Sequence, residues 1–494
     1  MPPKRACDNC ISRKVRCSGA TPCETCSDAA KPVTCTYLRP ARKRGPKARR
    51  LRRGHLADSK EPSPGLGGSP ERISDKSNGL PGQISRSVLA LIVRHYRQSS
   101  YSVWPVINAH GFLREINDIE PENSDPQAAM FDCLVTSLCA ATMAQLHLAP
   151  IWDGKVLVDS SVMGRTCLRL RDDYNCDRGN IGICSVLTSF FLHVYHAKLN
   201  QRTAAMLYIQ EAIAGARVLG LDRISRLHNV PESHLIVNKE LIFPLLWVTE
   251  RGYALHLNAS PLYTEPLSLP EITVSSTIDA QAHGLLDLAR LFVAFDHISV
   301  HRQPHAITSA PCLTDTEAKL SSVCLAEDQI SARTADCHIT REWMRTILWQ
   351  KALALGFLSS SSYTALMNFG FPGQIGRDLL RSLRCFTAAD LLPLGRDQLL
   401  KCFEIASTLA DTILLTSSTT YSGCEYGPQD FLHALYQKLL PSLEQDTVLQ
   451  HNLRSKMAEV LITAPARLLI REPNGMEEEE SREYSATAGT EFTV

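Results

Sequence analysis

The chain has 494 residues, too many for one ordinary domain, and its hydrophobic fraction of 44% is enough for a sizeable core. The net charge of +1 hides an asymmetry: residues 1–54 carry 15 Lys and Arg against 3 Asp and Glu, and the remainder carries 37 against 48. A basic N-terminal segment followed by an acidic remainder indicates a protein that binds nucleic acid rather than a membrane. The sequence has no uninterrupted apolar run of about eighteen residues, so no transmembrane helix is predicted.

The first predicted element is a metal site formed by closely spaced cysteines. Their spacing is C-x2-C-x6-C-x5-C-x2-C-x8-C, and the six positions are Cys7, Cys10, Cys17, Cys23, Cys26 and Cys35. A C-x2-C pair lets two thiolates bind one tetrahedral ion, and the cysteine that follows adds a third. Two tetrahedral zinc ions need eight ligand positions, so six thiolates suffice only if two are shared. The alternatives are an unrelated zinc ribbon, six free thiols or a disulfide framework.

Positive charge accompanies these cysteines. Two zinc ions with six thiolates carry a net charge of −2, and Arg13, Lys14 and Arg16 lie inside the metal loop. The first residues, MPPKRA, lack the apolar segment of a signal peptide. The eleven other cysteines are scattered singly through apolar segments, which is typical of a reducing compartment. We therefore expect an intracellular metal-binding protein.

Residues 7–35 resemble the fungal zinc binuclear cluster, the DNA-binding domain of fungal transcription factors. The residues that carry the resemblance are the six cysteines, Pro22 and the basic run Arg13, Lys14, Val15 and Arg16. The resemblance implies two zinc ions bridged by Cys7 and Cys23. It also implies that the helix after the first C-x2-C enters the major groove at a CGG triplet, with Arg13 and Lys14 at the base-contacting positions.

A strongly basic run follows the cysteines. Nine of the fifteen residues from Arg39 to Arg53 are Lys or Arg. Each could neutralise a phosphate, with binding that weakens as salt rises, and the run can also serve as a nuclear localisation signal. A solvated linker is the alternative. The residues predicted to bind DNA are Arg13, Lys14, Arg16, Arg42, Lys43, Arg44 and Lys47. The sequence around Tyr37 and residues 44–47 also resembles activators of maltose utilisation, without identifying target genes.

Residues 39–83 are predicted to be a basic and then Pro- and Gly-rich linker. The composition of residues 55–83 neither propagates a helix nor buries a core. Many members of the family dimerise through a coiled coil at this place, which sets the spacing of the half-sites. No heptad run is visible between residues 40 and 83. Homodimerisation is left open, and it would have to come from the large domain.

From residue 84 the apolar pattern becomes helical, and alternating strand patterns are scarce, so residues 84–472 predict an all-α body. The first helix places Val88, Leu91, Ile92 and Tyr96 at helical intervals. The clearest helix begins at Thr203, where one face is formed by Ile209, Ala212, Ile213, Ala216 and Leu219 and Gly220 ends the helix. Others are expected from residues 131, 185 and 239 and at 281–301, 340–356, 376–390, 397–415, 430–440 and 450–470.

Residues 84–275 also resemble the fungal-specific transcription factor domain, the middle homology region of zinc cluster regulators. The matching segments are Trp104-Pro105-Val106, residues 212–221 and residues 246–251. The resemblance implies an α-helical regulatory body that restrains or relays activation. It supplies no catalytic residues.

The body offers few candidates for chemistry. His193 and His196 are close in sequence, as are His301 and His305, but neither pair forms H-E-x-x-H. No catalytic serine motif, Walker loop or dinucleotide motif occurs. The carboxylates at 172–173 stand beside arginines and indicate a solvated charged face. The sequence therefore predicts that the chain is not an enzyme.

One group of residues in the body has two interpretations. Trp247, Glu250 and Arg251 could line an effector pocket between helices. The favoured interpretation is core packing by the tryptophan with a surface ion pair between the other two residues.

The acidic end of the chain, residues 473–494, suits either a disordered activation segment that binds a coactivator or an inert tail. The predicted organisation is a small zinc binuclear cluster DNA-binding domain at 1–38, the linker at 39–83, a large all-α regulatory domain at 84–472 and this tail. We expect a nuclear, zinc-dependent transcription factor that binds double-stranded DNA and activates genes of one pathway, sugar catabolism or secondary metabolism. The alternatives are a repressor, a non-specific nucleic-acid binder, and an enzyme with an appended zinc module.

Overall fold

The computed structural model describes residues 6–29, 34–37, 84–118, 126–173, 181–229, 233–270, 280–296, 309–325, 330–416, 426–443 and 446–463. The chain divides into two compact units, Met1–Ser77 and Asn78–Val494. The basic run, the linker, the pair His301 and His305, and the acidic tail lie outside the described residues.

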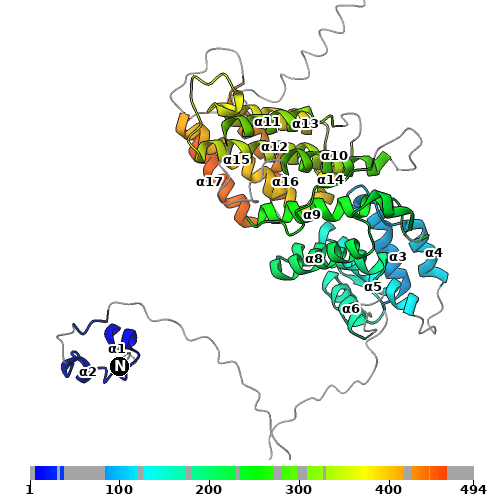
Figure 1. The fold of residues 1–494 in the computed structure, drawn as a ribbon, viewed down its shortest axis with the longest axis horizontal. Helices are drawn as coiled ribbons and strands as arrows, with labels where there is room; N and C mark the ends of the chain where they lie inside the picture. The colour runs from blue at the N-terminus through cyan, green and yellow to red at the C-terminus, as the bar shows by residue number, and fades with distance from the viewer. Residues whose placement is uncertain are drawn as a thin grey trace, which may run out of the picture. The chain divides into compact units, whose positions relative to one another are not determined.

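The first unit contains two short helices, α1 (Asp8–Arg13) and α2 (Glu24–Ser27), labelled in Figure 1. Each begins directly after a cysteine, and a second cysteine lies three residues further on, inside the helix. In the described part of this unit the buried side chains are Cys7, Cys10, Cys23 and Cys26. This small cysteine domain was predicted, and the structure confirms it.

The second unit begins with a bundle that we call the first bundle. Its members are α3 (Arg86–His95), the π-helical turn Tyr96–Ser100, α4 (Ala109–Asp118), α5 (Pro126–Leu146), α6 (Ser160–Asp173), α7 (Ile183–Lys198) and α8 (Arg202–Val218). A two-stranded antiparallel hairpin, β1 (Ile151–Trp152) and β2 (Leu157–Val158), lies between α5 and α6 in the chain. The 3-10 helices Ile224–Asn229 and Lys239–Leu241 lead to α9 (Ile242–His256).

Helix α5 is the central helix of the first bundle and packs against α3, α6 and α7. Its length and composition alone would allow residues 128–146 to cross a membrane, although this segment is not an uninterrupted apolar run. However, 89% of that window is buried within the protein. Its apolar surface is therefore covered by neighbouring helices, as expected for a core helix.

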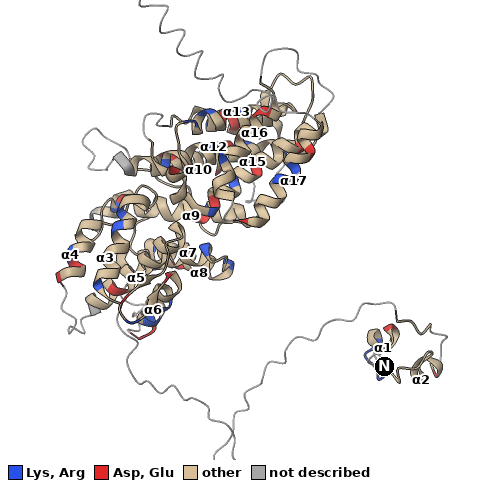
Figure 2. Cartoon of the chain, turned by 180° about the vertical axis from the view of Figure 1, so that it is seen from behind, with Lys and Arg blue, Asp and Glu red and all other residues tan. Residues whose placement is uncertain are grey.

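The second bundle follows α9, which packs against both α8 and α10. Its members are α10 (Ala280–Asp296), α11 (Ala310–Ser322), α12 (Ala332–Ala354), the 3-10 turn Ala365–Met367, α13 (Phe371–Leu383), α14 (Ala388–Leu391), the 3-10 turn Leu392–Leu394, α15 (Gly395–Thr416), α16 (Pro428–Leu443) and α17 (Thr447–Thr463). Helix α12 contacts α10, α11, α13 and α15 and forms its centre. Figure 2 shows positive and negative residues interspersed along the helices of the body.

The mostly helical body confirms the predicted fold class, and particular helices show where the sequence pattern was informative. In α8, Ile209, Ala212, Ile213 and Ala216 are buried, and Gly220 follows the helix with a φ of 73°. Leu91 in α3 remains 39% exposed. At about 100° per residue it points away from the face that buries Val88, Ile92 and Tyr96. Helices α4, α6 and α11 were not anticipated, and α12 begins eight residues before the predicted 340.

Candidate metal centre and nucleic-acid interface

The six cysteines of the first unit gather into two overlapping sets of four sulfur atoms. One set is Cys7, Cys10, Cys17 and Cys23, and the other is Cys7, Cys23, Cys26 and Cys35. Within each set all sulfur atoms lie within 4.8 Å of one another. Cys7 and Cys23 belong to both sets, so the six thiolates provide the eight positions that two tetrahedral ions require.

The distances between sulfur atoms fit zinc. A zinc–sulfur bond of about 2.3 Å in a tetrahedron separates neighbouring sulfur atoms by about 3.8 Å. The Sγ atoms of Cys7 and Cys23 are 3.7 Å apart, and the pairs Cys7–Cys26 and Cys10–Cys23 are each separated by 3.6 Å. The six cysteines therefore fit two zinc ions shared through Cys7 and Cys23. When bound, the ions supply the positive charge that holds six thiolates together.

The two halves of this unit repeat one arrangement. The backbone N–H of Cys7, just before α1, donates to the Cys17 Sγ at 3.4 Å, and the backbone N–H of Cys23, just before α2, donates to the Cys35 Sγ at the same distance. In each half, this hydrogen bond connects the start of the C-x2-C helix to the third cysteine of that half. Local backbone geometry, rather than an apolar core, positions the ligands.

Two thiols show how the fold prepares this site for a cation. The backbone N–H of Cys10 donates to the Cys7 Sγ at 3.4 Å and lowers the pKa of the Cys7 thiol to about 6. Burial raises the pKa of Cys10 to about 12, because the thiolate is removed from water. A bound divalent cation offsets that desolvation cost, since thiolates are the metal-ligating form.

The predicted base-contacting residues lie where α1 ends. Arg13 is the last residue of the helix, and Lys14 caps it with a φ of 55° and donates its backbone N–H to Ile11 O at 3.3 Å. Arg13, Lys14 and Arg16 are all exposed. Positive side chains are favourable at this end of a helix, where the carbonyl groups are unsatisfied. The other predicted contacts, Arg42, Lys43, Arg44 and Lys47, lie outside the described residues.

Two polar contacts close the cysteine unit and were missed by sequence reasoning. Asp8 donates its backbone N–H to Thr36 O at 2.8 Å, and the Thr36 Oγ1 donates to the Asp8 carboxylate at 3.2 Å. The Tyr37 hydroxyl donates to Ala20 O at 2.9 Å. Polar residues so far apart in sequence carry no periodic signal. They tie residues 36–37 back onto the cysteine loops.

The candidate histidines of the body are held in its interior. His193 Nδ1 lies 2.8 Å from Ala205 O, and His196 Nδ1 lies 2.5 Å from the Gln201 Oε1. The carboxylates at 172–173 are exposed, and the neighbouring Arg171 pairs with Glu211. Among the described residues, the histidine and carboxylate clusters of the body form no set with metal-ligand geometry.

The predicted surface ion pair beside Trp247 is wrong, because both charged residues are buried. Trp247, Glu250 and Arg251 are 1%, 1% and 3% exposed. The Arg251 guanidinium lies 3.6 Å from the centre of the Trp247 ring and donates to Tyr263 O at 3.0 Å. Glu250 accepts the backbone N–H of Leu262 at 2.9 Å. The two charges enter the core because backbone groups and a ring face replace the water they lose.

Comparison with known proteins agrees with the geometry of the cysteine unit. Residues 5–44 match the Fungal Zn(2)-Cys(6) binuclear cluster domain. No solved structure matches the chain.

Similar curated proteins extend over most of the chain. A maltose fermentation regulatory protein of Saccharomyces cerevisiae is 25% identical, covering 83% of this chain and 84% of its own length. A respiratory transcription factor of the same yeast is 23% identical over 96% of this chain and 98% of its own. A probable sucrose utilization protein of Candida albicans is 24% identical over 85% and 81%. The first two of these relatives are named as a regulatory protein and a transcription factor, which is consistent with the prediction that the chain is not an enzyme.

Proposed function

We propose that this chain, a fungal zinc-cluster transcription factor by its cluster domain and its relatives, activates RNA polymerase II genes of one catabolic pathway from the nucleus. The observation that carries the proposal is the cysteine unit itself. Two sulfur sets sharing Cys7 and Cys23 stand beside three exposed cations at the end of α1. Such an arrangement suits a DNA-binding domain whose fold is stabilised by metal and whose exposed basic side chains contact the DNA.

In the proposed complex, the end of α1 enters the major groove. Arg13 and Lys14 donate to guanine O6 and N7 of a CGG-type triplet, the commonest pairing of basic side chains with bases. Arg16 and the basic residues Arg42, Lys43, Arg44 and Lys47 neutralise phosphates, which adds affinity without sequence preference. Zinc holds the fold that presents these groups.

The proposed pathway is sugar use, because relatives are named for maltose fermentation and sucrose utilization. The body, residues 84–472, would regulate activation, and the acidic end at 473–494 would recruit a coactivator. A repressor is the alternative. Deleting the gene lowers the transcripts of its targets if the chain activates them and raises them if it represses.

Selection of random duplex DNA by the full-length protein, with and without a zinc chelator, tests the proposal. We expect enrichment of CGG triplets that is lost on chelation. The spacing of paired triplets reports whether one copy or two bind. Binding that ignores base sequence and survives chelation would contradict the proposal and favour a basic run acting alone.

The role of Lys14 can be tested separately. Lys14→Ala is expected to relax discrimination at one base and cost about 1–3 kcal/mol in specific binding. Lys14 holds a φ of 55°, and alanine keeps the Cβ that makes this conformation unfavourable, so Lys14→Ala removes only the side chain beyond the Cβ. Lys14→Gly removes the same group and also relieves the backbone strain. Equal losses in both variants assign the effect to the lysine side chain, whereas an unchanged base preference in both would contradict a base contact by Lys14.

A further inference from the structure

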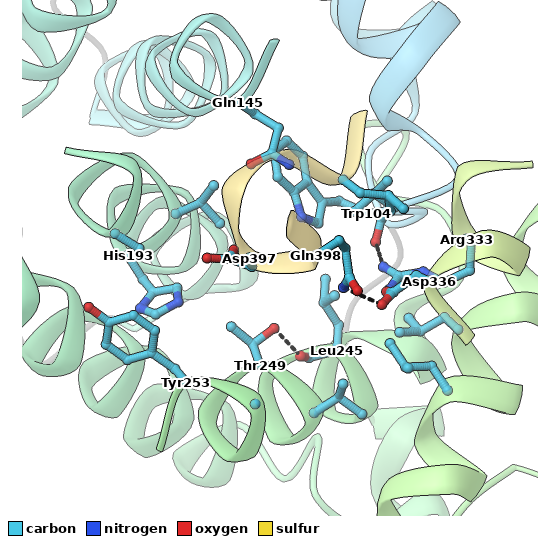
Figure 3. Close-up of a pocket in the computed structure, with 18 of the residues that line it drawn as sticks. Trp104, Gln145, His193, Leu245, Thr249, Tyr253, Arg333, Asp336, Asp397 and Gln398 are labelled. Carbon is cyan, nitrogen blue, oxygen red and sulfur yellow. Dashed lines mark hydrogen bonds and ion pairs between the residues drawn. The ribbon is translucent and has the colours of Figure 1, made fainter. Parts of the chain in front are cut away.

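A cavity of about 140 Å³ lies inside the helical body, between the two bundles. Its walls come from α5 and α7 of the first bundle, α10, α12 and α15 of the second, and α9 between them. Figure 3 shows Gln145, His193 and Trp104 on the walls given by the first bundle, with Arg333, Asp336, Asp397 and Gln398 on those of the second. A molecule bound here would contact both bundles at once.

The charged groups of this cavity already have partners. Lys198 pairs with Asp397 at 2.6 Å. Arg333 pairs with Asp336, and the Lys401 Nζ lies 3.5 Å from the same carboxylate. Each of the three cations therefore already pairs with a carboxylate, with Arg333 and Lys401 sharing that of Asp336, and an anionic ligand would have to compete with these pairs. The arrangement disfavours a ligand that carries a charge of its own.

Two amide oxygens in the walls have no hydrogen-bond partner among the described residues. Gln145, 3% exposed, donates its Nε2 to Pro393 O at 2.5 Å, and Gln398, 9% exposed, donates its Nε2 to Asp336. These donor contacts orient both amides, and each Oε1 is left without a donor. A buried acceptor without a donor is unfavourable. Neither oxygen has accessible surface in this structure, so a ligand that carries O–H or N–H groups would reach them after a small rotation of the amides.

The remaining lining sets the shape and size of such a molecule. Trp104, Phe190 and Phe292 contribute apolar surface, and Thr249 and Tyr253 contribute hydroxyls. A cavity of about 150 Å³ holds benzene, so this one has room for a single six-membered ring. Apolar walls with a few oriented polar groups are typical of small-molecule sites. Hydroxyls around the edge of a ring would meet the amide oxygens, and its C–H faces would meet the aromatic walls.

We propose that this cavity binds a neutral, polyhydroxylated six-membered ring, a hexose or a cyclitol, and that the ligand joins the two bundles. A role of this ligand in regulating transcription rests on the proposed function. The binding of the ligand to the cavity does not depend on that function. Binding and DNA selection are separate measurements, so either part can fail alone.

The first experiment titrates full-length, zinc-loaded protein with glucose, galactose and myo-inositol, following the melting temperature and the heat of binding. Glucuronate serves as a hexose ring with a charge, and cyclohexanol as a ring with one hydroxyl. We expect at least one neutral polyol to raise the melting temperature and to bind about tenfold or more tightly than both comparison compounds. The proposal would be overturned if none of the three polyols raised the melting temperature or bound, or if glucuronate or cyclohexanol bound as tightly as the polyols. The cavity would then hold only water.

Two variants locate the ligand. A Cβ added at Gly252 meets its nearest atom, in Phe292, at 3.5 Å, an ordinary contact, so Gly252→Ala fits while reducing the cavity. Thr249→Val removes a lining hydroxyl that donates to Leu245 O, and Thr412→Val removes the same kind of contact, to Thr408 O, away from the cavity. We expect both cavity variants to weaken binding about tenfold while Thr412→Val does not. Unchanged binding in both cavity variants, or equal loss in Thr412→Val, would place the ligand elsewhere.

Discussion

The two units of the chain use cysteine in opposite ways. In the described part of the first unit, buried side chains are cysteines that converge on one centre. In the body, cysteines such as Cys139 and Cys402 are buried singly among leucines and aromatic residues. The first unit therefore depends on metal for its fold, while the body depends on apolar surface removed from water. The environment, rather than the residue type, decides whether a thiol is a ligand or a small hydrophobic group.

The largest expected effect separates the two units by chelation. Removing zinc should unfold the cysteine unit and abolish specific DNA binding, because structural zinc in small domains contributes about 10–16 kcal/mol of apparent binding free energy. The body should keep its helical circular dichroism and its melting temperature. If chelation also unfolded the body, the body would depend on zinc as well, and the contrast between the two units would be wrong.

The converse experiment disturbs the body alone. Trp247→Ala should lower the free energy of unfolding of the body by about 3–5 kcal/mol, since it removes a buried ring and exposes the Arg251 guanidinium that lies on it. The zinc content of the variant should remain two ions per chain. Urea unfolding and metal analysis of the same sample measure both, and loss of zinc would link the units.

Acid should weaken the body through its buried histidines. Burial lowers the pKa of His193 to about 4 from 6.5, so the folded protein keeps this ring neutral. Its stabilising contribution is complete above pH 6.5 and is lost as the pH falls toward 4, because the unfolded chain takes up the proton first. The loss should be on the order of 2–3 kcal/mol. His193→Phe should flatten this dependence in urea unfolding at pH 7 and pH 5, and an unchanged slope would assign it to other groups.

The smallest effect is expected at a cysteine of the body. Cys402→Ala should cost about 1 kcal/mol of stability, because only a small buried group is lost. Cys10→Ala, the matched change in the first unit, removes a ligand and should release zinc. Release of zinc by Cys402→Ala as well would contradict the separation of roles.

The sequence was most informative where function depends on local spacing. Six cysteines within one short segment allowed the shared metal site to be predicted, since ligand geometry follows from C-x2-C spacing. The apolar periodicity of α8 likewise predicted its buried face. Helix α12 was predicted only in part, because the charged residues at its beginning, Arg333 and Asp336, are buried against each other. Composition cannot distinguish a buried ion pair from a solvated one.

The cavity could not be predicted in this way. Its polar walls combine Gln145 of α5 with Gln398 of α15, which are adjacent only in the folded body. Trp247 was considered as lining for a pocket between helices, yet its neighbours on the same helix, Thr249 and Gly252, line the cavity instead. Which face of α9 meets empty space depends on the packing of both bundles.

Helix α12 also fixes which changes of length the body can accept. Along it, Arg333, Asp336, Thr340 and Arg345 each meet a specific partner outside the helix. One inserted residue would rotate everything after it by about 100° and carry these groups away from their partners together. The tip of the β1–β2 hairpin, by contrast, has exposed side chains and space around Gly154. Insertions and deletions should therefore accumulate at the hairpin and be absent from α12.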